Sequence, residues 1–389
     1  MQALTDLINS TEGLNLLESE GVFVTEQTFI EKLKLPVENS LADALGVENQ
    51  KLVCSGQQIY VDYRQSVLSK IETLRSMAQN KDHFPFFLWV DTDRSGSDNL
   101  ITKFAWPVSG KKGPITILPP GTKQVETRFV TLDDSVLTSA IDKLETHLRQ
   151  SGENIKGAKE KYQQLRTFFT KGHPTILSEF NLHLTDFLLT NVFSFMPYSV
   201  MLSELLDKTF VLGQVNLFVN RISDVVAAFN QAIDSLAQKG INPQVRRLSD
   251  HYLPLFYSCQ DDNMRLRLYH LIEGSDHFAV GACKCGREYR FYLGQNTLAI
   301  DQIAQTNRWS PDVCFPIFFN DLVSGFVAGK SSAIYLMVMN NVMREALDKA
   351  PVPVLVPKNL DLKGTVNGNG NGRKGSARFD SLIYRYLAG

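Results

Sequence analysis

Short apolar runs that end in polar residues mark the first part of the chain. Leu52-Val53-Cys54 leads into a polar stretch at residues 55–58, which predicts a strand followed by a loop, and the next segment has the spacing of a helix. Residues 85–90 are continuously apolar up to Asp91, as expected of a strand covered on both faces in a parallel sheet. Strand, helix and strand predict a βαβ unit, whose ligands bind at the carboxyl ends of the strands.

The middle of the chain changes from a helical pattern to an alternating one. Apolar residues recur at helical spacing over residues 137–148, 155–168 and 222–236, and the last of these helices is expected to end at Gly240 in a left-handed cap. Residues 253–294 form short alternating runs broken by turn residues, which predicts an antiparallel meander. From Cys314 onward the arrangement of strand, loop and helix repeats.

These patterns predict an α/β fold with a Rossmann-like parallel-sheet core, a helical insertion and a small antiparallel β meander. The expected boundaries place the first half of the core in residues 1–130, a helical connective insertion in 131–240, the meander in 241–300, and the second half of the core in 301–389. This last part includes a flexible, basic tail rich in glycine and asparagine.

Composition narrows the classes of function. Among 389 residues, 40 Lys and Arg nearly balance 41 Asp and Glu, so no overall field attracts nucleic acid or an anionic membrane. No stretch reaches the roughly 18 apolar residues of a membrane span, and no signal peptide begins the chain, which predicts a cytoplasmic protein. Five cysteines, an odd number, are expected to be reduced thiols.

Several loops match, in order, motifs of one family. The matching segments are Gly56-Gln57-Gln58 with Lys70 in the next helix, Leu88 to Asp93, Leu184-Thr185-Asp186-Phe187 as a helix start, Trp309 to Val313, Ala328 to Tyr335, and Pro351 to Lys358. Together they resemble the bacillithiol biosynthesis cysteine-adding enzyme, which joins cysteine to the amine of glucosaminyl malate.

The chain also departs from the family pattern. Thr92 stands where the family has histidine, and Phe315-Pro316 with Asn320 stands where it has arginine, proline and glutamine. Residues 328–335 match the family's Ala-Gly-Pro-Gly-Glu-Ile-x-Tyr segment only at Ala328, Gly329 and Tyr335. The resemblance implies a core related in plan to class I aminoacyl-tRNA synthetases. The family's long C-terminal coiled coil has no counterpart here, which favours a monomer or a different dimer.

Candidate site residues follow the predicted strands. Asp91 and Asp93 suit Mg²⁺, a ribose hydroxyl or an ammonium group, although Asp is also common in turns. Gln57 and Gln58 have amides that both donate and accept hydrogen bonds, and Lys70 could balance a phosphate or carboxylate. Asp91 and Asp93 are therefore the catalytic candidates, and the other three are candidates for binding.

Two further segments offer cations or free N–H groups. Lys330, Ser331 and Ser332 open a predicted helix, where an anion or an ordinary N-cap is expected, and the earlier glycine of a P-loop is absent. Asn320 is a further binding candidate from the family pattern. Lys374 and Arg378, in the glycine-rich tail, could close over a phosphate, and a surface loop is the simpler interpretation.

The cysteines give a weaker signal. Cys283-Lys284-Cys285, with Cys259 upstream, lacks a second close pair and nearby histidines, so we predict no metal site and interpret the pair as small side chains on one face of a strand.

The combined hypothesis is a ligase that joins an amino acid, with cysteine as a candidate, to a small amine acceptor. ATP with Mg²⁺ is the candidate cofactor pair for activating the carboxylate. Two alternatives remain open. One is a metal-dependent nucleotide-sugar glycosyltransferase that uses Asp91 and Asp93, and the other is a non-catalytic partner protein that retains the core.

Overall fold

The chain folds into two compact units. The computed structural model describes residues 4–96, 100–108, 111–151, 158–243, 245–312, 321–357 and 381–388. Unit 1 consists of Met1–Gly56, Glu72–Leu88 and Pro197–Lys358, and unit 2 of Gln57–Ile71, Trp89–Met196 and Asn359–Gly389. The division cuts through the predicted insertion of residues 131–240 at Pro197.

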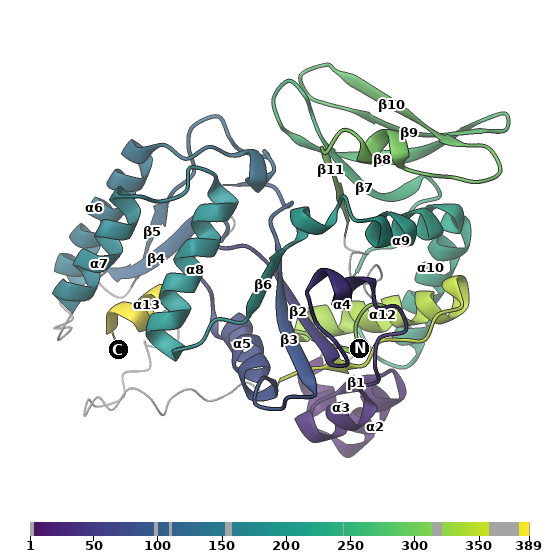
Figure 1. The fold of residues 1–389 in the computed structure, drawn as a ribbon, viewed down its shortest axis with the longest axis horizontal. Helices are drawn as coiled ribbons and strands as arrows, with labels where there is room; N and C mark the ends of the chain where they lie inside the picture. Colours follow the sequence, from purple (N-terminus) through teal and green to yellow (C-terminus); the bar gives the residue numbers. More distant parts are fainter. Residues whose placement is uncertain are drawn as a thin grey trace. The chain divides into compact units, whose positions relative to one another are not determined.

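A six-stranded sheet forms the centre of unit 1 (Figure 1). Its order is β1 (Val22–Phe23), β13 (Val354–Leu355), β12 (Gly325–Val327), β2 (Lys51–Gln58), β3 (His83–Val90) and β6 (Tyr198–Met201). The pairs β1–β13, β13–β12 and β12–β2 run parallel. The predicted parallel-sheet core is therefore confirmed.

The direction in which successive strands are added to the sheet reverses between β12 and β2. The chain passes from β2 through α5 (Gln65–Met77) to β3 on one side, and from β12 through α12 (Lys330–Leu347) to β13 on the other. In open α/β sheets, ligands bind outside the carboxyl ends of the strands at such a switch point. In this topology the candidate ligand-binding residues are those that follow β2, β3 and β12.

Helices of unit 1 pack on the sheet and on one another. Helix α12 contacts α10 (Ile222–Gln238), α1 (Leu4–Ile8) and β13, while α2 (Thr11–Ser19) and α3 (Glu26–Lys32) contact β1. Helix α10 buries Ile222, Val225, Phe229, Ile233 and Leu236, the stripe that the sequence predicted, and Gly240 has a φ of +81°. Unit 1 also contains α4 (Ser40–Ala44), η2 (Leu202–Leu205), α9 (Thr209–Asn220) and α11 (Asp301–Ala304).

The predicted meander is also confirmed. Strands β7 (Tyr252–Ser258), β8 (Arg265–Glu273), β9 (Asp276–Ala282) and β10 (Glu288–Gly294) pair antiparallel in sequence order. A fifth strand, β11 (Trp309–Pro311), pairs antiparallel with β7 and was not predicted. In Figure 1 these strands are drawn in green.

Unit 2 combines a hairpin with helices around an aromatic core. The hairpin is β4 (Lys103–Val108) and β5 (Lys111–Thr116), and α6 (Asp134–Ser151) packs on both strands. Helix α7 (Ala158–Thr170) contacts α6 and α13 (Leu382–Ala388), which also contacts α8 (Leu177–Phe193). The 3-10 turn η1 (Thr127–Phe129) lies against α8. Phe169 and Phe180, both fully buried, meet edge to face with ring centroids 5.2 Å apart.

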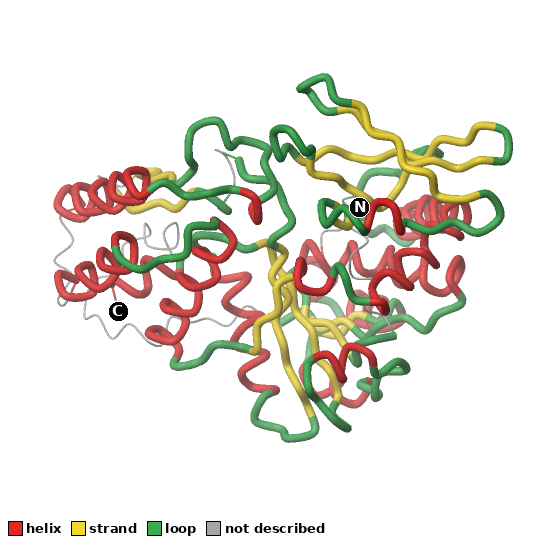
Figure 2. The backbone as a smooth tube through the Cα atoms, turned by 45° about the horizontal axis from the view of Figure 1, so that its top comes forward, coloured by secondary structure: helices red, strands yellow, loops and turns green. Residues whose placement is uncertain are grey.

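Three sequence predictions need correction; the elements can be followed in Figure 2, where helices are red and strands yellow. Gln57 and Gln58 belong to β2 and do not lie in a loop after it. Residues 184–187, compared with a helix start, lie in the middle of α8. Cys283 and Cys285 lie in the turn after β9, so they are not two side chains on one face of a strand. Within the described ranges, no helix has both the length and the apolar character needed to cross a membrane.

Candidate functional site

The end of β2 carries a connected set of polar side chains within unit 2. Gln57 Nε2 donates to Gln58 Oε1 at 2.6 Å, and the Tyr60 hydroxyl donates to the same oxygen at 3.2 Å. Gln58 and Tyr60 share a face because they are two residues apart in an extended segment. Lys70 Nζ donates to Gln57 Oε1 at 3.2 Å. We call Gln57, Gln58, Tyr60, Lys70, Asp91 and Asp93 the strand-end group.

Lys70 is the unexpected member of the group, because its residue is only 3% exposed. It lies on α5, and its ammonium contacts the Gln57 amide. Removing an ammonium group from water is costly unless polar or charged partners replace the water. A lysine held in this way at the carboxyl end of a strand can attract the carboxylate or phosphate of a ligand.

Two carboxylates follow β3 beside the same strand end. The backbone N–H of Ile59 donates to the carbonyl of Val90 at 3.2 Å, which keeps the two segments side by side. Asp91 comes next and is 1% exposed, whereas Asp93 is half-buried. Their backbone carbonyls both accept hydrogen bonds from Thr127, which fixes the path of this loop.

Asp93 also has a local role. Its Oδ1 accepts a hydrogen bond from the backbone N–H of Arg94 at 2.7 Å, as in an ordinary turn. The carboxylate nevertheless acts on the strand-end group. Burial raises the pKa of Tyr60, the side chain of Gln57 opposes this rise, and the charge of Asp93 adds to it.

Tyr60 is a site residue that the sequence analysis missed. The signal was the period of two in Gln58-Ile59-Tyr60, which puts the amide and the phenol on one face once β2 is known to continue through Gln58. A second missed residue is Asn181 on α8, whose Nδ2 donates to the carbonyls of Ile59 and Ile101 at 3.2 and 2.9 Å. Asn181 thus holds the segment that carries Tyr60.

The predicted anion site at the start of α12 lies in unit 1. Gly329 is the N-cap and no side chain caps the helix, Lys330 is half-buried, and Ser332 is exposed. The helix is therefore preceded by a strand and a glycine, as predicted. The side chain of Ser331 lies outside what the structure describes, as do residues 313–320, with Asn320, and 358–380, with Lys374 and Arg378.

The two carboxylates of Asp91 and Asp93 are better suited to binding an ammonium group than to coordinating a metal ion by themselves. In the described part of the chain, the cluster of at least three metal-ligating side chains lies in the meander, and the strand-end group supplies two carboxylates. Mg²⁺ bound to nucleotides commonly uses one or two carboxylates together with phosphate oxygens. The two aspartates would fit Mg²⁺ only as the partner of a bound phosphate.

Comparison with known proteins adds no relative. No protein-family model matches this chain, and no curated protein matches it. The resemblance to the cysteine-adding enzymes therefore rests on the ordered motifs alone and stays a prediction.

Proposed function

We propose that this protein is a ligase that joins an amino acid, with cysteine as the first candidate, to a small amine acceptor. The supporting observation is the buried ammonium of Lys70 beside Gln57, with Asp91 and Asp93 following the adjacent strand. A cation and two carboxylates at the carboxyl ends of parallel strands suit a small ligand with both acidic and basic groups.

Each side chain has a role in this proposal. Lys70 binds the carboxylate or phosphate of a substrate, and the Gln57 and Gln58 amides bind its polar groups. Asp91 and Asp93 hold the amine, and a carboxylate there can accept the proton that the amine loses when its nitrogen attacks the acyl carbon. ATP with Mg²⁺ would activate the carboxylate of the amino acid by adenylation with release of pyrophosphate, and AMP would leave the acyl carbon as the amine nitrogen bonds to it.

The first test measures ligand binding to the full chain. Thermal unfolding is followed with ATP, cysteine, other amino acids, nucleotide sugars and Mg²⁺, because selective binding to the folded state raises the unfolding temperature. The ligase proposal predicts stabilisation by an amino acid or by ATP. Stabilisation only by a nucleotide sugar with a divalent metal would support a glycosyltransferase instead, and no response to any of these compounds would favour a partner protein.

Variants test whether binding occurs at the strand-end group. We expect Lys70→Met and Asp91→Asn to weaken binding of the stabilising ligand by about tenfold or more, as loss of a charge-assisted hydrogen bond costs about 1.5–3 kcal/mol. Lys143→Met and Asp186→Asn are matched controls on exposed positions of α6 and α8 and should bind normally.

The same variants separate a binding role from a structural one. If Lys70 serves a ligand, Lys70→Met removes a buried charge and leaves the ligand-free protein equally or more stable. Lower stability with unchanged ligand affinity would mean that Lys70 serves the fold and would contradict the proposal.

A further inference from the structure

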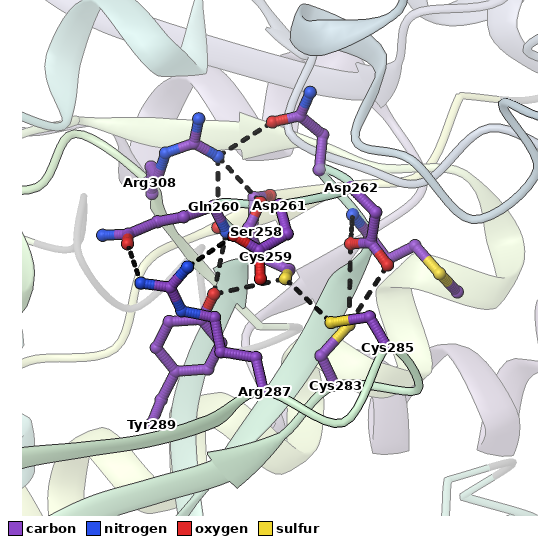
Figure 3. Close-up of polar contacts among 12 residues, drawn as sticks. Ser258, Cys259, Gln260, Asp261, Asp262, Cys283, Cys285, Arg287, Tyr289 and Arg308 are labelled. Atoms are coloured by element: carbon purple, nitrogen blue, oxygen red, sulfur yellow. Dashed lines mark hydrogen bonds and ion pairs between the residues drawn. The ribbon is translucent and has the colours of Figure 1, made fainter.

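The turns of the meander bring together four potential metal ligands. Cys259 directly follows β7 and Asp262 lies in the same turn, while Cys283 and Cys285 lie in the turn between β9 and β10. Successive strands of a meander reverse direction, so these two turns lie at the same end of the sheet. The three sulfur atoms and a carboxylate oxygen all lie within 4.8 Å of one another (Figure 3).

The distances agree with a tetrahedral zinc site. Cys259 Sγ lies 3.6 Å from Cys285 Sγ, and Cys283 Sγ lies 3.5 and 3.4 Å from the two carboxylate oxygens of Asp262. With a Zn–S distance of about 2.3 Å and a Zn–O distance of about 2.1 Å, a tetrahedron has edges of about 3.8 Å between sulfurs and about 3.6 Å between sulfur and oxygen. A disulfide would instead require sulfur atoms about 2.05 Å apart.

The surrounding residues hold the first turn in place, as Figure 3 shows. Tyr289 donates its hydroxyl hydrogen to Cys259 Sγ at 3.2 Å and accepts a hydrogen bond from the backbone of Gln260 at 2.8 Å. Arg308 donates to the carbonyl of Cys259 at 2.9 Å and to the side chain of Asn263 at 2.8 Å. Metal ligands are commonly oriented by such hydrogen bonds from a surrounding layer.

The second turn is linked to the first by Arg287. Its guanidinium forms an ion pair with Asp261 and donates to Gln260 Oε1 at 2.6 Å. Cys259 and Cys283 are buried, whereas Cys285 is exposed. Cys285 therefore exposes one member of the cluster to solvent.

We propose that Cys259, Asp262, Cys283 and Cys285 bind one Zn²⁺ ion that joins the two turns of the meander. Three thiolates and one carboxylate suit zinc, a borderline-soft ion that accepts both sulfur and oxygen ligands. Four protein ligands close the coordination shell, so the ion would stabilise the sheet and take no direct part in catalysis. The site is independent of the strand-end group, because all its ligands lie in unit 1.

The test begins with the metal content of the full chain. The protein is purified without chelators from cells supplied with zinc, and we expect one zinc ion per chain by elemental analysis. Cys283→Ser and Cys285→Ser should lose the ion. Cys54→Ser is the matched control, because Cys54 is buried in β2, and it should retain zinc at the wild-type level.

Asp262 gives a test that does not depend on removing a thiol. Its Oδ1 also accepts a hydrogen bond from the backbone of Met264 at 3.0 Å, a turn contact that Asp262→Asn can keep. We expect Asp262→Asn to weaken zinc binding by about tenfold or more, because a neutral amide is a poorer ligand than a carboxylate.

Cobalt provides a spectroscopic readout of the same residue. Asp262→Cys should still bind one ion, and its Co²⁺ form should absorb about one third more strongly in the thiolate charge-transfer band, since four thiolates replace three. This increase would show that the side chain at position 262 reaches the metal ion.

Several results would overturn the zinc proposal. These are zinc-free wild-type protein that gives no thiolate band with Co²⁺, equal zinc content in Cys283→Ser and wild type, or a disulfide between Cys259 and Cys285 in peptides mapped without reducing agent. Because zinc content is measured without a substrate, failure here leaves the ligase proposal unaffected.

Discussion

Replacement of Asp62 by asparagine is expected to stabilise unit 2 at pH 8 and to leave its stability nearly unchanged at pH 4. Asp62 is 5% exposed, and its Oδ1 accepts hydrogen bonds from the backbone N–H groups of Tyr63 and Ile383, both at 2.9 Å. The carboxyl therefore connects the segment before α5 to α13. Burial raises its pKa from 3.8 to about 6, although these hydrogen bonds favour the charged form.

The direction of the pH dependence follows from proton binding. Between pH 3.8 and about 6 the folded state binds more protons than the unfolded state at Asp62, so this residue makes the protein less stable as the pH rises. Above about pH 7 the loss is complete and amounts to roughly 3 kcal/mol, at 1.36 kcal/mol for each pKa unit. Asparagine keeps an acceptor oxygen for the Ile383 N–H and carries no charge, so it avoids this loss.

The measurement is urea unfolding of wild type and Asp62→Asn at several pH values. The difference in unfolding free energy between the two proteins should grow from pH 4 to pH 7 in favour of the variant and then stay constant. Asp186→Asn, an exposed control on α8, should give a difference that stays small at every pH. A variant less stable than wild type at pH 8 would show that the charged form of Asp62 supports the fold.

The second large effect is expected from Asn181→Leu. Asn181 is fully buried on α8, and its Nδ2 donates to the carbonyls of Ile59 and Ile101. Leucine has a similar size and no donor, so both carbonyls lose this partner in an apolar environment. The substitution leaves two buried carbonyls without this donor. Each buried acceptor that loses its partner costs about 1–3 kcal/mol. Because Ile59 lies between Gln58 and Tyr60, the strand-end group should also lose affinity for its ligand.

Asn191→Leu is the matched control on the same helix. Asn191 is exposed and donates only locally, to the carbonyl of Phe187, so its replacement should change the unfolding free energy by less than about 0.5 kcal/mol. Unfolding is followed by urea titration, and ligand affinity by calorimetry with whichever compound stabilises the wild type. Equal stability of Asn181→Leu and Asn191→Leu would show that the two carbonyls find other partners.

Parts of the fold that depend on local periodicity were predictable. The apolar run of β3, the stripe of α10 and the alternation in β7–β10 appear in the structure close to their expected bounds. The apolar pattern did not reveal helix α8, and the resemblance placed only a helix start at residues 184–187, because its buried stripe contains Ser178, Asn181 and Thr185, polar residues that conceal the helical period. Their burial depends on partners elsewhere in the chain, such as the carbonyl of Ile101.

The candidate sites show the same limit. The sequence identified Asp91 because it follows a strand of a βαβ unit, and the resemblance to the family pattern identified Gln57 and Lys70. It did not indicate that Lys70 is buried against Gln57 or that Tyr60 belongs to the group. Those contacts depend on how α5 packs against the end of β2.

The sequence by itself determined the α/β class, the parallel core and the meander, because hydrophobic period depends on residues a few positions apart. Only the tertiary structure placed Cys259 and Asp262 beside Cys283 and Cys285, which are more than 20 residues away along the chain. Metal-ligand geometry needs side chains from two turns to converge. That convergence depends on the register of β7–β10, and the positions of the four ligands along the chain do not reveal this register.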